Sequence, residues 1–478
     1  MNSIRTIDGQ WWIYGDDDQP QFGTLTFDSE DGLELTVKAP RDCLRHATLD
    51  SDLDLDYRPQ VIHGVDVHQN PITLFGSTST TLSEQGNRET WKISGVAAAL
   101  LNDRVPSLRE APFRAARFGY TLLDSWMDHR LDVNSKVEDG RLTLTCALQE
   151  RFDYEISPQV RLKIDGRILR QESASAWRLE WKYDLWFIFA KDCDAETIVN
   201  SYGAAMLRLL SFLTDETVYY TGIALYKTDP FHPRTVSREY ELLLPTPGIS
   251  RAIILGRPRG MIAAFPEICS EVELVLKRWF ACQEKMAPVL DLYSSVEMNR
   301  ELTVETCFLF LAQALEVYHA RSGHFKNKAL PDDEYRTRKE TILKGCPAAY
   351  VSWLREIMAF SNQPKLAQRI DEVLARHSDT APRLTQGIKD FAAKVRYTRN
   401  YLTHYGESTE RKAAKGDELH RIAAALKGLL KICLLSELGL KGAPVARVLD
   451  DWPQLPIPVE DANNDQGGIL EDDDDLPA

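Results

Sequence analysis

The first half of the chain alternates apolar and polar residues in short runs. Gly23–Phe27, Leu33–Val37 and Arg178–Tyr183 place an apolar side chain at about every second position, which is the period of a β-strand with one wet face. Clusters of Asp, Gly and Pro separate the runs. A helical period interrupts them at Ala195–Leu213, so residues 1–250 are predicted to form an antiparallel β assembly, in one sheet or two, with an inserted helix. The same signals predict strands at Trp11–Tyr14, Ile72–Phe75, Trp91–Ile93, Leu142–Leu148, Val160–Ile164, Leu179–Ile188, Val218–Leu225 and Ser237–Leu244.

From Pro266 onward, apolar residues recur with the 3.6-residue period of α-helices. Helices are predicted at Ile268–Ala287 (ended by Pro288), Leu302–Arg321, Asp333–Lys344, Ala348–Phe360, Pro364–His377, Leu384–Tyr405 and Asp417–Leu438. Two of them carry clear apolar stripes, formed by Phe308, Leu311, Ala312, Leu315 and Tyr318, and by Ile422, Leu426, Leu429, Leu430, Cys433 and Leu434. After Pro444 the chain becomes rich in Pro and Asp and loses its period, and Val459–Ala478 is predicted to be a disordered acidic tail.

These patterns predict an α+β multidomain protein in which a β-rich part precedes an all-helical part. The predicted divisions are a β-rich domain at 1–250, a helical connector at 251–300, a helical bundle at 301–442 and a tail at 443–478.

Composition places the chain among soluble globular proteins, with 44% hydrophobic and 27% charged residues. No run approaches the roughly 20 apolar residues that span a bilayer, and the first residues lack the apolar core of a signal peptide. The eight cysteines are scattered singly, without metal-ligand spacing. We therefore predict buried free thiols in a reducing cytoplasm, with no disulfide framework, metal or cofactor.

The net charge of −14 is unevenly distributed. Residues 460–478 hold eight acidic and no basic residues, whereas residues 385–431 hold ten Lys and Arg against five Asp and Glu. A locally basic segment can collect phosphate on an acidic chain. An ordinary solvated helix face explains the same composition equally well.

The chemistry that stands out lies in Val395–Gly406, V-R-Y-T-R-N-Y-L-T-H-Y-G. It combines Arg399, which can hold a phosphate, with His404, which can move a proton near neutral pH. The Arg-x4-His spacing alone means little, because Arg41–His46 and Arg58–His63 share it within the β-rich half.

Context favours the copy at Arg399. The apolar stripe Ile388, Phe391, Ala392, Val395 leads by a step of four to Arg399 and on to Leu402, and a guanidinium on a buried stripe needs a carboxylate, a phosphate or a wet cleft. The motif closes its helix, where His404 and Tyr405 can leave the helical path before Gly406. Positions five apart on a helix point about 140° apart, so the two side chains do not converge on a regular helix. The alternative is a buried Arg–carboxylate pair with a capping histidine.

The helix array followed by Arg399–Gly406 resembles a HEPN domain, the all-α family with an R-x4-6-H ribonuclease motif near the end of its penultimate long helix. Phe308–His319, F-L-F-L-A-Q-A-L-E-V-Y-H, resembles the first HEPN helix of ApeA-type phage-defence proteins. Gly9–Phe27 is similar to the opening of the ApeA N-terminal domain, and Val61–Phe75 fits the strand pair that follows there.

The resemblance implies roles for individual residues. Arg399 and His404 match the catalytic pair, and Asn400 matches the polar position that often follows the Arg. Glu316 lies where first HEPN helices often carry an acidic residue, although a solvated helix charge is the alternative. Tyr405 can stack on a base, but packing against the protein is the expectation.

We predict a metal-independent endoribonuclease that cuts host RNA, including tRNA, in abortive phage defence. The resemblance further implies a phage-derived trigger, a cleft formed by two protomers and no membrane partner. Two rival functions stay open: a non-catalytic module that binds RNA or a partner protein, and a nucleotide-handling enzyme. Gly256–Gly260 lacks both the spacing and the lysine of a phosphate-binding loop, which argues against the second.

Overall fold

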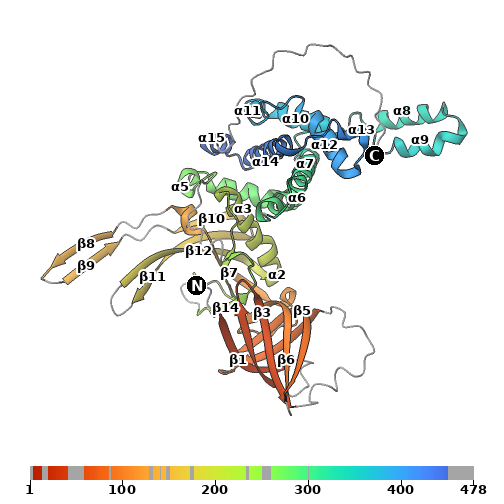
Figure 1. The fold of residues 1–478 in the computed structure, drawn as a ribbon. Helices are drawn as coiled ribbons and strands as arrows, with labels where there is room; N and C mark the ends of the chain where they lie inside the picture. The colour runs from red at the N-terminus through yellow and green to blue at the C-terminus, as the bar shows by residue number, and fades with distance from the viewer. Residues whose placement is uncertain are drawn as a thin grey trace. The chain divides into compact units, whose positions relative to one another are not determined.

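The fold is described from a computed structural model of the 478-residue chain. The structure describes residues 4–12, 20–40, 59–85, 88–128, 133–139, 141–146, 151–172, 177–232, 236–249, 260–299 and 301–450. The chain divides into two compact units, unit 1 at Met1–Phe280 and unit 2 at Ala281–Ala478. Unit 1 is built on β-strands and unit 2 on helices, which confirms the predicted fold class (Figure 1).

The strands of unit 1 within the described ranges are β1(Arg5–Trp12), β2(Gln21–Asp28), β3(Gly32–Pro40), β4(Pro59–Asp66), β5(Pro71–Gln85), β6(Arg88–Leu101), β7(Pro112–Tyr120), β8(Val133–Glu138), β9(Arg141–Cys146), β10(Phe152–Ser157), β11(Val160–Glu172), β12(Trp177–Asp194), β13(Tyr220–Tyr226) and β14(Tyr240–Leu243). Twelve of these form one antiparallel sheet in the order β10-β11-β12-β7-β13-β14-β6-β3-β2-β1-β4-β5, and β8 pairs with β9 separately.

One end of the large sheet closes on itself. An additional pairing between β5 and β6 joins the ends of the series β6-β3-β2-β1-β4-β5, so six strands form a barrel (Figure 1). The interior holds the apolar residues that alternate along these strands, with Trp11 fully buried at its centre. Trp11 fits because Gly64 lies opposite it; a Cβ on Gly64 would be 2.3 Å from the indole ring. The indole Nε1 donates a hydrogen bond to the Gly23 carbonyl at 3.1 Å.

The rest of the sheet is open and is centred on β7, a strand that the sequence patterns do not predict. Its residues Ala115, Ala116 and Phe118 are all fully buried, because both faces of this part of the sheet are covered. A helical segment packs on one face, where the Tyr120 hydroxyl donates to the Gly203 carbonyl at 2.9 Å. Strand β7 buries residues on both faces, and Arg114 and Arg117 interrupt its apolar residues, so it lacks the alternation that marks the other strands.

The helical segments of unit 1 and the junction are η2(Leu108–Glu110), α1(Leu123–Met127), α2(Ala195–Thr197), the π-helical turn η3(Ile198–Gly203), α3(Ala204–Thr214) and α5(Phe265–Ile268). The run α2-η3-α3 confirms the inserted helix predicted at Ala195–Leu213. Helix α6(Val272–Met298) contains the boundary between the two units.

The described helices of unit 2 after α6 are α7(Val304–Arg321), α8(Asp332–Lys344), η4(Ala348–Tyr350), α9(Val351–Ile357), α10(Leu366–Arg376), α11(Ala381–Leu384), α12(Phe391–His404), α13(Glu407–Glu410), α14(Gly416–Leu438) and α15(Ala443–Asp450). Helices α7 and α14 pack together, and α10 and α12 pack against each other and against α7. Every member of the two predicted apolar stripes is buried. Helices α8 and α9 form a hairpin with no buried residue, and it extends from the other helices of the unit (Figure 1).

Three predicted helix boundaries are wrong. Helix α6 runs through Pro288 to Met298, because a proline removes one helical hydrogen bond but does not prevent burial of the next turn, where Val289 and Leu290 are buried. The predicted helix Leu384–Tyr405 is two helices, since Gly387 and Asp390 take left-handed conformations between α11 and α12. Ile388 therefore precedes the helix whose stripe it was assigned to.

The third boundary concerns the tail predicted from residue 443. Ala443–Asp450 form helix α15, with Pro444 and Val448 buried, so the loss of periodicity expected after Pro444 is wrong for these residues. The proline occupies the first turn, where its missing N–H leaves no helical bond unmade. The remainder of the predicted tail lies outside the described residues.

The cysteines and the membrane prediction can be compared within the described ranges. The six cysteines described there are free thiols, but only Cys433 is buried and Cys269 is exposed, so the expectation of buried thiols is wrong for most of them. No helix in the described part of the chain combines the length and the hydropathy needed to cross a membrane.

Candidate active site

Arg399 lies in the last turns of α12, at the edge of the face that packs into unit 2. Phe391, Ala392, Val395 and Thr398 are the buried residues of this helix, and Arg399 is half-buried beside them. Its Nη1 lies 3.5 Å from Oδ1 of Asn400, the one polar side-chain contact of Arg399 within the described residues. The carboxylate partner that the alternative interpretation requires is therefore not found in that part of the chain, and the guanidinium keeps its hydrogen-bond donors for another anion.

His404 is the last residue of α12 and is exposed. Among the described residues its imidazole has no hydrogen-bond or ion-pair partner, so neither ring nitrogen is committed to the protein. Tyr405 leaves the helix in the left-handed conformation, with φ 51° and ψ 33°, and its N–H donates to the Tyr401 carbonyl at 2.6 Å. The helix was predicted to reach about Tyr405 and to release both His404 and Tyr405; it ends one residue earlier, and only Tyr405 leaves the helical path.

The two side chains do not converge. Because α12 is regular from Phe391 to His404, Arg399 and His404 point about 140° apart around the helix axis. Asn400 lies between them in projection, about 100° from Arg399 and about 40° from His404. The polar face that these three residues define therefore wraps around the end of the helix.

Tyrosines and cations surround this helix end. Tyr397, Tyr401 and Tyr405, which we call the tyrosine row, repeat at the four-residue spacing that lines up side chains along a helix. The rings of Tyr401 and Tyr405 meet edge to face, with centroids 5.4 Å apart. Cations lie over the other rings: Arg396 at 4.5 Å and Lys412 at 4.8 Å from Tyr397, and Lys415 at 5.2 Å from Tyr401.

The lysines of this group differ in their partners. Lys415 pairs with Glu410 at 2.7 Å; its hydrogen bond raises the pKa of Lys415 and lowers that of Glu410. Lys412 has no carboxylate partner among the described residues. The expectation that Tyr405 packs against the protein is wrong, because its side chain is 70% exposed. Tyr401, Lys412 and Lys415 were not predicted as site residues, although the four-residue spacing of the tyrosines is present in the sequence.

Glu316 lies on α7 and is not paired with Arg399. Its Oε1 is 4.0 Å from Nε of Arg369, a buried residue of α10. His319, one turn further along α7, was expected on the helix surface, but it is fully buried. Its Nε2 lies 2.7 Å from Oε2 of Glu372, and its ring stacks on Phe325 at 4.4 Å. This network ties α7 to α10 and gives Glu316 a structural partner.

Of the two other Arg-x4-His matches, only His63 lies within the described residues. Arg41, His46 and Arg58 lie outside the described residues. His63 lies on β4, where its Nδ1 is 3.4 Å from the Thr73 hydroxyl. The described part of the chain holds no cluster of three His, Cys, Asp or Glu residues suited to a metal ion.

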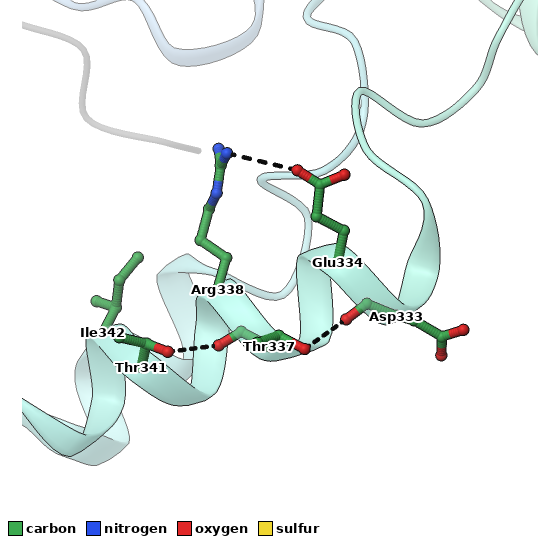
Figure 2. Close-up of a pocket in the computed structure, with 6 residues that line it drawn as sticks. All are labelled: Asp333, Glu334, Thr337, Arg338, Thr341 and Ile342. Carbon is green, nitrogen blue, oxygen red and sulfur yellow. Dashed lines mark hydrogen bonds and ion pairs between the residues drawn. The ribbon is translucent and has the colours of Figure 1, made fainter.

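Two surface cavities of unit 2 lie apart from the candidate residues. One, of about 520 Å³, is lined by Asp333, Glu334, Thr337, Arg338, Thr341 and Ile342. Figure 2 shows that all six belong to α8 and that several bond to one another, including Arg338 and Glu334 at 3.9 Å. Residues of a single helix cannot enclose a substrate. The other, of about 450 Å³, is lined in part by His377, Ser436 and Lys441.

The fold and the site together define a class: a β-rich unit followed by a helical unit of HEPN type, with an arginine and a histidine at the end of an internal helix. The model of the Apea-like HEPN family matches residues 309–443, and the model of ApeA N-terminal domain 1 matches residues 6–253, more than half of the chain. The chain belongs to the ApeA family. Membership indicates an HEPN protein of phage defence, and HEPN domains are generally ribonucleases that commonly dimerise. No curated protein and no solved structure matched the chain.

Proposed function

We propose that this protein is an endoribonuclease whose catalytic residues are Arg399 and His404. The observation that carries the proposal is the state of these two side chains. Both lie in the last two turns of α12, and within the described residues neither has a charged partner. A half-buried guanidinium without a carboxylate, near an uncommitted imidazole, is an arrangement suited to an anionic substrate.

The two residues divide the chemistry of RNA cleavage. His404 takes the proton from the 2′-hydroxyl or returns one to the leaving oxygen, as a histidine can near neutral pH. Arg399 holds the scissile phosphate and the negative charge that develops in the transition state. Asn400 supports the phosphate or the guanidinium through its amide. The products carry a 2′,3′-cyclic phosphate or a 3′-phosphate, and DNA is not cut because it lacks the nucleophile.

The angle between the residues requires a second protomer. Side chains that point about 140° apart on one helix cannot bind the same phosphate group. Two copies of α12 related by a two-fold axis bring the Arg399 of each close to the His404 of the other. The active form is therefore a homodimer or a higher oligomer, with the cleft between its helical units.

We propose that this chemistry serves abortive phage defence, which membership of a phage-defence family supports. A dormant enzyme is released by a phage-derived component and then cuts host RNA, with tRNA as the proposed target. The β-rich unit 1, which carries no catalytic motif in this scheme, is the proposed sensor, and the cytoplasm is the proposed location.

Substitution tests the site directly. Arg399→Ala and His404→Ala should each lower RNA cleavage roughly 100-fold or more, while cleavage by the wild type persists in EDTA. His63→Ala, a spacing match on β4, and Arg336→Ala, on the exposed face of α8, are controls expected to retain activity. Wild-type activity in both site variants, or its abolition by EDTA, refutes the mechanism.

A mixture of the two inactive variants tests the shared cleft. A mixed dimer retains one Arg399 and one His404 in the same cleft, so part of the activity should return when the variants are combined. Binding of RNA by the wild type without any cleavage, and no toxicity on overexpression, would instead favour a non-catalytic binding module.

A further inference from the structure

Tyr405 ends α12 in a left-handed backbone conformation that is unfavourable for a tyrosine. Its φ of 51° lies in the left-handed region, which a bulky side chain enters at a cost of about 1–3 kcal/mol. The next residue is Gly406, a residue type that adopts this conformation freely. Burial of the ring does not offset this cost, because Tyr405 is 70% exposed. The strained position therefore presents an aromatic ring to solvent beside His404.

The tyrosine row offers graded access to its rings. Arg396 and Lys412 both lie over the ring of Tyr397, so cations cover this ring. Tyr401 has Lys415 over its ring and forms an edge-to-face pair with Tyr405. No cation lies over Tyr405 among the described residues, which leaves its ring open. Along the row, Tyr397 is contacted by two cations, whereas Tyr405 has none over its ring among the described residues and can stack on a base.

Exposed aromatic faces next to cations are the features that bind unpaired RNA. Bases stack on tyrosine rings, and lysines follow the phosphate backbone. Residues three apart on a helix have Cβ atoms roughly 5–6 Å apart, which places Tyr401 next to His404. A base stacked at the end of the row would therefore have its ribose and phosphate close to the histidine.

We propose that Tyr405, supported by Tyr401, stacks on the base next to the scissile phosphate, with Lys412 and Lys415 along the backbone. The proposal rests on the proposed ribonuclease function and specifies its substrate class: an unpaired RNA segment, either a loop or a single strand. A base within a duplex keeps its faces against its neighbours and cannot reach the ring. Tyr405 is then a substrate-binding residue that selects unpaired RNA.

The left-handed backbone at Tyr405 allows the ring to be removed without a loss of stability. Tyr405→Gly removes the ring and also relieves the left-handed backbone, so the variant should fold at least as well as the wild type. Tyr405→Trp keeps a stacking surface. Tyr350→Ala is the matched control, because Tyr350 is 59% exposed in the same unit but lies on η4.

The experiment uses the full chain and a short single-stranded RNA with 2-aminopurine at successive positions. In the His404→Ala background, which is expected not to cut, binding should quench the fluorescence of one 2-aminopurine. Tyr405→Gly should abolish this quenching and weaken binding roughly 5- to 150-fold, while Tyr405→Trp and Tyr350→Ala retain both. In the active background the same variant should raise KM by a similar factor, with a smaller change in kcat.

The outcomes separate the stacking proposal from the ribonuclease proposal. Unchanged quenching and KM in Tyr405→Gly overturn the stacking role even if Arg399 and His404 prove catalytic. Loss of quenching in a protein that never cuts RNA supports the stacking role alone. Equal affinity of the protein for a duplex of the same length also overturns the proposal. So does a loss of protomer association of Tyr405→Gly in sedimentation without any loss of quenching, which would make the ring part of an interface between copies.

Discussion

The hydroxyl of Thr398 is predicted to hold the segment between Lys412 and Lys415 against α12. Thr398 is fully buried on α12, immediately before Arg399. Its Oγ1 accepts a hydrogen bond from the backbone N–H of Ala414 at 2.9 Å and donates one to the Lys394 carbonyl at 2.8 Å. The first bond links α12 to the segment between Lys412 and Lys415. Replacement by valine keeps the shape of the side chain and removes the acceptor.

The expected cost follows from the buried N–H that is left without a partner. Such a group destabilises by about 1–3 kcal/mol, and the effect should be local to this segment. Hydrogen exchange of the Ala414 amide should therefore be roughly 5- to 150-fold faster in Thr398→Val than in the wild type. KM for RNA should rise as well, because Lys412 and Lys415 are no longer held in place.

Two variants control this experiment. Thr398→Ser restores the acceptor and should recover most of the protection, with about 0.8 kcal/mol lost for the missing methyl group. Thr403→Val removes an exposed hydroxyl that donates to the Arg399 carbonyl at 2.7 Å, and it should change stability by about 0.5 kcal/mol at most. Equal exchange of Ala414 in Thr398→Val and Thr403→Val would show that the hydroxyl does not anchor this segment.

Two further predictions concern the stability of each unit. Gly64→Ala places a Cβ 2.3 Å from Trp11 inside the barrel and should lower the thermal unfolding midpoint through a cost of at least about 1–3 kcal/mol; Gly222→Ala, whose Cβ meets nothing within 4 Å, should not. Burial and the nearby Arg376 lower the pKa of His377. The folded state thus binds the proton less readily than the unfolded state, so stability is highest above about pH 6.5 and falls as the pH drops below it. His377→Gln should flatten this dependence in melts between pH 7.5 and pH 5.5, and a slope equal to that of the wild type contradicts the assignment.

The prediction of elements from the sequence succeeded where one face of an element is buried. Helices α7 and α14 each bury one broad apolar stripe. The helical period of their apolar residues is therefore clear in the sequence, and their ends were predicted to within two residues. It failed where the apolar pattern is too short or too irregular to show a period. Strand β7 buries residues on both faces and is interrupted by Arg114 and Arg117, and α15 is short and carries a proline in its first turn. The helix end predicted at Pro288 is wrong because packing of the neighbouring turns stabilises α6 on both sides of the proline. The local sequence does not show this packing.

For the candidate site, the sequence located the helix end but not the surroundings of each side chain. The motif, the half-buried arginine and the departure of Tyr405 from the helix all follow from local pattern. His319 shows the limit, since it was expected on the surface and lies fully buried against Glu372 of α10. Its partner is 53 residues away along the chain, so only folding brings the two together.

By itself, the sequence determined the order of a β-rich part and a helical part, the apolar faces of the main helices and the end of α12 to within one residue. These depend on side chains a few residues apart, whose spacing is fixed by strand and helix geometry. The tertiary structure decided the closure of the barrel by β5 and β6, the burial of His319, the pairing of Glu316 with Arg369 and the gathering of Lys412 and Lys415 over the tyrosine row. Each of these joins residues from different elements, and such contacts form only when the elements pack.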